Sequence, residues 1–247
     1  MSTDHTPGER PVFVHVMKTG GATFRRRMEA NLGAELVYPN AAIDTDMRAA
    51  NADLSYFRSI PEERMRTLRG FTGHFPFIVT KLVPGPVVTM TVLRDPVERT
   101  ISYLKHCRAY QEQHHGMALE EIYEDPWYFP LMMLNHQVRV FALTLEDDPE
   151  NATEIVELND ERLGWARGHL ESVDFLGLHE HYDDFVEEVT QYFGWSGKSP
   201  PNWHVSEPEH VSAALRRRIA DDMAIDLEFY EFARELHAER HRRKAAR

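Results

Sequence analysis

One short segment, FVHVMKTGGATF at residues 13–24, limits the possible folds of this 247-residue chain more than any other feature. It begins as an apolar run, passes through Lys18, Gly20 and Gly21, and continues with apolar residues at helical spacing. The pattern predicts a buried strand, a glycine turn and a helix that opens near Gly21 or Ala22. Glycines let a turn direct several backbone N–H groups at one anion, and the positive end of a helix dipole adds to the attraction. An anion site is therefore expected at this turn.

The side chains of the turn fit this interpretation. Lys18 can supply a point charge, and the hydroxyl groups of Thr19 and Thr23 can act as donors. A purely structural turn with a surface lysine is the alternative. The lysine precedes the glycines, whereas a Walker motif places it after them, and GWSGKS at residues 194–199 has too few residues between its glycines to be one.

A second strand-to-helix boundary lies at residues 87–98. The run VVTMTVL is rich in β-branched residues and predicts a buried, parallel strand that ends at Arg94. Asp95 is suited to cap the helix that follows, Pro96 to its first position, and Glu98 to a capping box. The planar guanidinium of Arg94 is suited to bidentate contact with a phosphate.

The remaining pattern alternates between strands and helices. It predicts an α/β fold, a single domain with a central parallel sheet flanked by helices. The expected segments are a disordered leader at 1–10, the domain at 11–238 and a frayed basic tail at 239–247. Further strands are expected near residues 70 and 175, and further helices at 119–123, 131–143, 152–171, 180–193 and, as a pair, 211–237. In parallel sheets ligands bind beyond the carboxyl ends of the strands, where Lys18 and Arg94 are expected.

Composition excludes several classes of protein. The formal net charge of −12 argues against nucleic-acid binding, so an anionic ligand needs a local basic site. The single cysteine, Cys107, allows no internal disulfide and fits a reducing cytoplasm. The sequence has neither a signal peptide nor an apolar run of about 18 residues that could span a bilayer. A cytoplasmic protein without a membrane span is expected.

Two stretches then resemble a known family. Residues 13–24 resemble the 5′-phosphosulfate signature of sulfotransferases that use 3′-phosphoadenosine-5′-phosphosulfate (PAPS), and VLRDPVERTISY, residues 92–103, resembles their 3′-phosphate signature. The sequences of both segments are most similar to those of the heparan-sulfate 2-O-sulfotransferase branch of the Golgi-type carbohydrate enzymes and of soluble bacterial relatives. GHFPF, NHQVRVFAL, VDFLGL and DLEFYEFA follow in the order of the family over about residues 12–233. The resemblance implies a P-loop-like nucleotide-binding architecture.

The resemblance also implies roles for individual residues. Lys18 would bind the 5′-phosphate and the bridging oxygen of PAPS, while Arg94 and Ser102 would bind the 3′-phosphate. Met17 stands where the family usually has proline, which should loosen the turn slightly. The remaining residues implied at the nucleotide are Thr19, Gly20, Gly21, Thr23, Phe24 and, stacked on the adenine, Trp203.

Two histidines are candidates for the general base. The resemblance favours His74, although the family branch carries His-Gly-His where this chain has Thr72-Gly73-His74. His15 is the second candidate, within the first strand, and either histidine could instead be structural. The same applies to Asn135, Gln137 and Arg139, which would line the acceptor side or simply lie on a helix surface, and to Arg99, for which an ion pair with Glu98 or Asp95 is expected.

The implied activity is transfer of a sulfuryl group from PAPS to a hydroxyl of a carbohydrate-containing or other small-molecule acceptor, with PAP (3′,5′-ADP) as product. No metal is expected, and the histidine pairs at 114–115 and 179–181 are interpreted as solvated positions and not as ligands. The alternatives are a catalytically inactive module that binds PAP or PAPS, and an ATP-dependent, kinase-like transferase. The sequence indicates neither the acceptor nor the oligomeric state.

Overall fold

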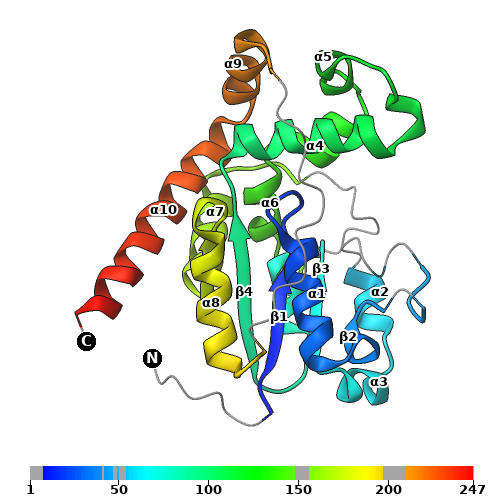
Figure 1. Cartoon of the computed structure of the whole chain (residues 1–247), viewed down its shortest axis with the longest axis vertical. Coiled ribbons are helices and arrows are strands. Elements are labelled where there is room, and N and C mark those ends of the chain that lie inside the picture. The colour runs from blue at the N-terminus through cyan, green and yellow to red at the C-terminus, as the bar shows by residue number, and fades with distance from the viewer. Residues whose placement is uncertain are drawn as a thin grey trace.

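A sheet of five parallel strands forms the centre of the molecule (Figure 1). The computed structural model describes residues 8–40, 42–46, 49, 54–147, 156–196 and 210–246. The strand order is β2-β3-β1-β4-β5, and every pairing is parallel. The predicted α/β fold with a central parallel sheet flanked by helices is confirmed. The strands are β1 (Arg10–Val14), β2 (Val37–Tyr38), β3 (Gly70–Gly73), β4 (Val87–Leu93) and β5 (Phe175–Leu178).

The middle strand, β1, is covered on both faces. It pairs with β3 through Phe13 and Thr72 and with β4 through Phe13 and Met90. Because side chains of a strand alternate between faces, Phe13 packs in one apolar cluster and Val14 in another, and both are fully buried. Burial on both faces explains why the strand is apolar without alternation.

Helices α1 (Gly21–Leu32) and α8 (Tyr182–Phe193) cover the face that carries Phe13. Phe24 of α1 and Phe185 of α8 meet there, with ring centroids 5.2 Å apart. Helices α6 (His136–Ala142), α7 (Asp160–Glu171) and α10 (Ala224–Ala245) cover the opposite face.

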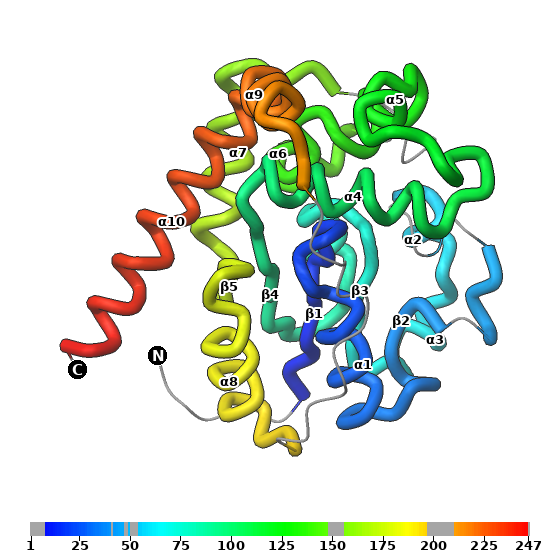
Figure 2. Tube along the Cα trace, turned by 45° about the horizontal axis from the view of Figure 1, so that its top comes forward, coloured from blue at the N-terminus to red at the C-terminus, as the bar shows by residue number. Residues whose placement is uncertain are grey.

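Helix α4 (Pro96–Tyr110) lies across the carboxyl-terminal edge of the sheet, as Figures 1 and 2 show. Above it, α5 (Leu119–Tyr123), a π-helical turn (Phe129–Met133) and α9 (Ala213–Asp222) build a separate apolar cluster. Helices α2 (Leu54–Ser59) and α3 (Glu62–Thr67) pack beside β2 and β3. Short 3₁₀ segments occur at η1 (Ala34–Leu36), η3 (Phe77–Lys81), η4 (Glu112–His114) and η6 (His179–His181).

Three segments differ from the sequence prediction. The helix expected at 131–143 is interrupted, because Asn135 has a φ of 46° and separates the π-helical turn from α6. The helix expected from 152 begins at Asp160, and residues 152–155 lie outside the described part. The tail expected to fray continues α10 through Ala245, where Arg240 donates to the carbonyls of Val173 and Glu171.

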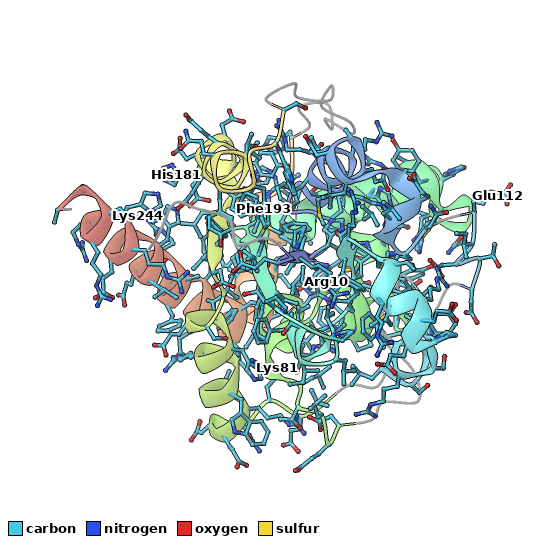
Figure 3. The ribbon with its side chains drawn as sticks, turned by 90° about the horizontal axis from the view of Figure 1, so that it is seen from below. Arg10, Lys81, Glu112, His181, Phe193 and Lys244 are labelled. Carbon is cyan, nitrogen blue, oxygen red and sulfur yellow. The ribbon has the colours of Figure 1, made fainter. Side chains whose placement is uncertain are left out.

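Figure 3 shows the molecule from below the view of Figure 1, with Arg10 of β1 near the centre and Lys244 on the projecting part of α10. None of the helices in the described ranges is both long enough and apolar enough to cross a membrane.

Candidate functional site

The connections that follow β1 and β4 run to opposite faces of the sheet. These two strands are neighbours, but the helix after β1 packs on one face of the sheet and the helices α6 and α7 before β5 pack on the other. In open parallel sheets the carboxyl ends of such a strand pair are where ligands bind. The residues at this edge are those that follow Val14 and Leu93, which include Lys18 and Arg94.

The turn after β1 is held in an unusual backbone conformation. Lys18 has a φ of 70° and Gly20 a φ of 93°. The hydroxyl of Thr19 donates to the carbonyl of Val16 at 2.8 Å, and this side chain is fully buried. In this structure the proton of the Thr19 hydroxyl is used to close the turn, and its role as a donor to an anion stays a prediction.

Both glycines are required by close neighbours. A Cβ on Gly20 would lie 2.9 Å from the ring of Tyr182, whose hydroxyl donates to the Gly20 carbonyl. A Cβ on Gly21 would lie only 1.9 Å from Cδ2 of His15. The turn thus packs against the neighbouring helix and the His15 ring at distances that no side chain permits.

The first N–H groups of α1 remain open. Among the described residues, the backbone N–H groups of Thr19, Gly20 and Gly21 have no hydrogen-bond acceptor, whereas those of Thr23 and Phe24 donate to the Gly20 carbonyl. The Phe24 side chain is fully buried, with its ring 4.5 Å from that of Phe13. Open donors are available at residues 19–21, and Phe24 contributes packing instead.

Arg94 is tied to this turn and to α6. Its Nη1 donates to the Lys18 carbonyl at 3.1 Å. The Gln137 amide holds the Arg94 backbone in both directions, accepting from its N–H at 3.1 Å and donating to its carbonyl at 2.7 Å. The hydroxyl of Ser102, half-buried on α4, has no hydrogen-bond partner among the described residues.

Lys18 and Arg94 have no counter-ion among the described residues. Within the described part of the chain, neither Lys18 nor Arg94 forms an ion pair with a carboxylate. Burial lowers the pKa of Lys18, and the positive charges of Arg94 and Arg99 lower it further. Burial also lowers the pKa of Arg94, although Glu98 and Asp95 partly oppose the shift. Groups of one sign are thus held together and partly desolvated, which favours a bound anion.

His74 follows β3 and faces the same turn. Its Nδ1 lies 2.9 Å from the carbonyl of His15, which can only accept, so Nδ1 carries the proton and Nε2 has a free lone pair. Burial lowers the His74 pKa, and nearby Arg99 lowers it as well. The imidazole is therefore neutral at pH 7. His15, expected within the strand, lies one residue beyond β1, and the two histidine rings are 4.3 Å apart.

The residues expected on the acceptor side have structural partners. Asn135 and Gln137 are buried, and their side chains connect α6 to Asp226 and to Arg94. The carboxylate of Asp226 accepts from the N–H groups of Gln137 and Val138. Burial raises the pKa of this carboxyl to about 6. Arg139 donates to the carbonyls of Pro130 and Leu134.

The ion pair expected for Arg99 is absent. Asp95 caps α4 as predicted by accepting from the N–H of Glu98. The Glu98 side chain pairs with Arg216 and does not complete the expected capping box. Arg99 is instead fully buried and donates through Nε to the carbonyl of Met17 at 3.2 Å.

The interpretation of the histidine pairs changes at one position. His114 is not solvated, since it is buried between Gln111 and Asp125. No group of three or more His, Cys, Asp or Glu among the described residues is arranged to hold a metal ion. Trp203, expected to stack on adenine, lies outside the described residues.

Comparison with known proteins finds similarity in fold but not in sequence family. The sequence matches no known protein family and no curated protein. The fold is similar to the crystal structure of a sulfotransferase from Alicyclobacillus acidocaldarius, with a TM-score of 0.47 and 14% sequence identity over 91% of this chain and 96% of that chain. A likeness at this level concerns the fold and says nothing of the chemistry.

Proposed function

We propose that this protein is a sulfotransferase that transfers a sulfuryl group from PAPS to a hydroxyl of a carbohydrate or other small molecule in the cytoplasm. The observation that carries the proposal is the pair of cations at the β1–β4 edge. Lys18 and Arg94 come from neighbouring strands, are linked at 3.1 Å through the Lys18 carbonyl, and have no carboxylate partner in the described structure. Partly buried charges without a partner are costly, and a bound anion compensates them.

PAPS fits the donors at this edge. It carries two separate anionic ends, and two separate sets of donors are present. Lys18 and the open N–H groups of residues 19–21 would hold the 5′-phosphosulfate at the start of α1. Arg94 and the free hydroxyl of Ser102 would hold the 3′-phosphate. The resemblance of residues 13–24 and 92–103 to the two sulfotransferase signatures supports the same assignment.

His74 is proposed as the general base. Its Nε2 takes the proton of the acceptor hydroxyl while the acceptor oxygen forms a bond to sulfur. The bond from sulfur to the 5′-phosphate oxygen breaks, its electron pair stays on that oxygen, and PAP leaves. Lys18 stabilises the charge that develops on this oxygen, which is where a cation lowers the barrier most. The hydrogen bond to the His15 carbonyl keeps the His74 ring in the required tautomer.

Nucleotide preference tests the proposal. Thermal unfolding is followed with PAP, 5′-ADP or ATP in the absence of magnesium. At 100 times its dissociation constant, a ligand stabilises the folded state by about 2.7 kcal/mol, which corresponds to roughly 5–10 °C for a chain of this size. PAP is expected to stabilise the wild type, and Arg94→Ala to abolish the effect. Arg234→Ala, at an exposed arginine paired with Glu231 on α10, is the matched control and should leave it intact.

The outcomes separate the alternatives. Equal stabilisation by ATP, or none by PAP, contradicts the proposal and favours a kinase-like transferase or another function. If PAP stabilises the protein but His74→Ala leaves sulfuryl transfer unchanged, the nucleotide site stands and the assignment of the base is wrong. If wild-type protein binds PAPS and transfers sulfuryl groups to no hydroxyl acceptor, an inactive binding module is the better description.

A further inference from the structure

Arg99 is a buried charge that the proposed mechanism does not use. Its side chain is fully buried on α4, and among the residues that the structure describes neither Nη1 nor Nη2 has a hydrogen-bond partner. Only Nε is engaged, with the carbonyl of Met17. Most buried polar groups in proteins are paired, so a guanidinium with two open nitrogens calls for an explanation.

The carboxylate of Asp226 does not satisfy Arg99. It attracts the guanidinium electrostatically, but among the described residues neither Nη1 nor Nη2 forms a hydrogen bond to it. Both carboxylate oxygens of Asp226 accept backbone N–H groups at the start of α6. Burial lowers the pKa of Arg99 to about 10, so the group is still charged at neutral pH.

The position of Arg99 relates it to both ends of the proposed reaction. Its Nε contacts the carbonyl of the residue that precedes Lys18. Its positive charge lowers the pKa of Lys18 and also that of His74. The guanidinium carbon lies 5.3 Å from the ring centre of Tyr103, which packs against it on α4. Arg99 therefore contacts the turn that carries Lys18, and its charge acts on both Lys18 and His74.

We propose that the two open nitrogens of Arg99 bind oxygens of the sulfuryl group itself. This inference rests on the proposed function, in which the sulfuryl group passes between Lys18 and His74. The planar fork of a guanidinium matches two oxygens of a tetrahedral anion. Donors fixed in a desolvated site, where charge spreads over the transferring group, lower the barrier without reorganisation. Arg94 holds the nucleotide at its far end, whereas Arg99 distinguishes PAPS from PAP.

A purely structural role for Arg99 predicts different behaviour. If Arg99 only braces the Met17 carbonyl, its loss weakens the fold and affects PAP and PAPS equally. If it holds the sulfuryl group, Arg99→Met removes an unpaired buried charge while keeping an apolar side chain. Replacement of buried charges by apolar groups is often neutral or stabilising. The variant should then fold well and still fail to distinguish PAPS from PAP.

The test compares the affinities of PAPS and PAP by calorimetry without acceptor, together with thermal unfolding. For Arg99→Met we expect PAPS binding to weaken about tenfold or more, PAP binding to change less than about twofold, and the melting temperature to stay the same or rise. In Arg99→Ala, added guanidinium ion should restore part of the PAPS affinity. Arg139→Met is the matched control, because this half-buried arginine is engaged by the backbone carbonyls of Pro130 and Leu134. It should lower the melting temperature and leave the PAPS-to-PAP ratio unchanged.

Several results would overturn the inference. Equal effects of Arg99→Met on PAPS and PAP, or no effect on either, contradict it while the proposed function stands. Wild-type protein that binds neither nucleotide contradicts the proposed function and this inference together. Should Arg99→Met not fold, Arg99→Gln, which can still donate to the Met17 carbonyl, is judged by the same ratio.

Discussion

Gln137 allows a direct test of how firmly the proposed nucleotide site at the carboxyl ends of β1 and β4 is held. Its side-chain amide is buried and forms two hydrogen bonds to the backbone of Arg94, one in each direction. Gln137→Met keeps the length and approximate volume of the side chain but removes both bonds. The Arg94 N–H and carbonyl then lose their partners at the end of β4.

The magnitude follows from these two bonds. A neutral hydrogen bond contributes about 1 kcal/mol net, and a buried group left without a partner costs about 1–3 kcal/mol. Partial access of water to Arg94, which is half-buried, places the expected loss near the lower end, at about 2–3 kcal/mol of the free energy of unfolding. In a chain of this size that loss lowers the melting temperature by roughly 4–12 °C. Because the Arg94 guanidinium is also less well placed, PAP affinity should fall by about tenfold.

Urea unfolding and a PAP titration check both values. Gln191→Met is the control, because this glutamine on α8 is exposed and bonds only to Glu187 one turn away. It should change stability by less than about 0.5 kcal/mol. Unchanged stability and PAP affinity in Gln137→Met would refute the argument that this amide positions Arg94.

Three further outcomes follow from the site. The free energy of unfolding of Asp226→Asn, relative to that of the wild type, should rise by about 3 kcal/mol between about pH 4 and pH 7, measured by urea unfolding at both values. The wild type loses stability over this range because its folded carboxyl keeps its proton up to a pKa of about 6, while the unfolded one ionises near pH 4. A difference that does not depend on pH would exclude this. Gly21→Ala should lose about 1–3 kcal/mol and its response to PAP, because the new Cβ meets the His15 ring, whereas Gly164→Ala, in open space on α7, should not lose stability. For His74, the pKa lowered by burial predicts that the acidic limb of the rate of sulfuryl transfer lies at lower pH than an ordinary histidine would give, and that His74→Ala removes this limb.

Local signals in the sequence predicted the elements that surround the site. The glycine turn predicted the start of α1 near Gly21 or Ala22, and the helix begins at Gly21, because glycines and the helical spacing after them depend only on neighbours in sequence. Asp95 was predicted as a helix cap for the same reason, and its carboxylate accepts from the N–H of Glu98. The apolar run at β4 indicated a strand buried on both faces, which a parallel sheet requires.

Contacts between segments that are distant in sequence could not be predicted from local signals. Gln137 lies 43 residues from Arg94 in the sequence. Nothing in the local pattern of a polar residue on a helix indicates that its amide forms hydrogen bonds to the backbone at the end of β4. Arg99 was expected to pair with a neighbouring carboxylate, because Glu98 and Asp95 are adjacent in sequence. In the structure Glu98 pairs with Arg216 of α9, 118 residues away, and the Arg99 side chain is buried. The available signal was helical position: on α4, Arg99 precedes Tyr103 by one turn, and both lie on its buried side.

The overall charge of −12 and an anion site are compatible because of where the charges lie. The cations of the site are withdrawn from water, and burial is the largest cause of the lowered pKa of Lys18, Arg94 and Arg99. Described carboxylates near them are engaged elsewhere, since Glu98 pairs with Arg216 and Asp226 accepts backbone N–H groups. In a partly desolvated site, nearby charges act more strongly than distant ones screened by solvent. A local excess of positive charge at the β1–β4 edge can therefore attract an anion although the whole molecule would repel it.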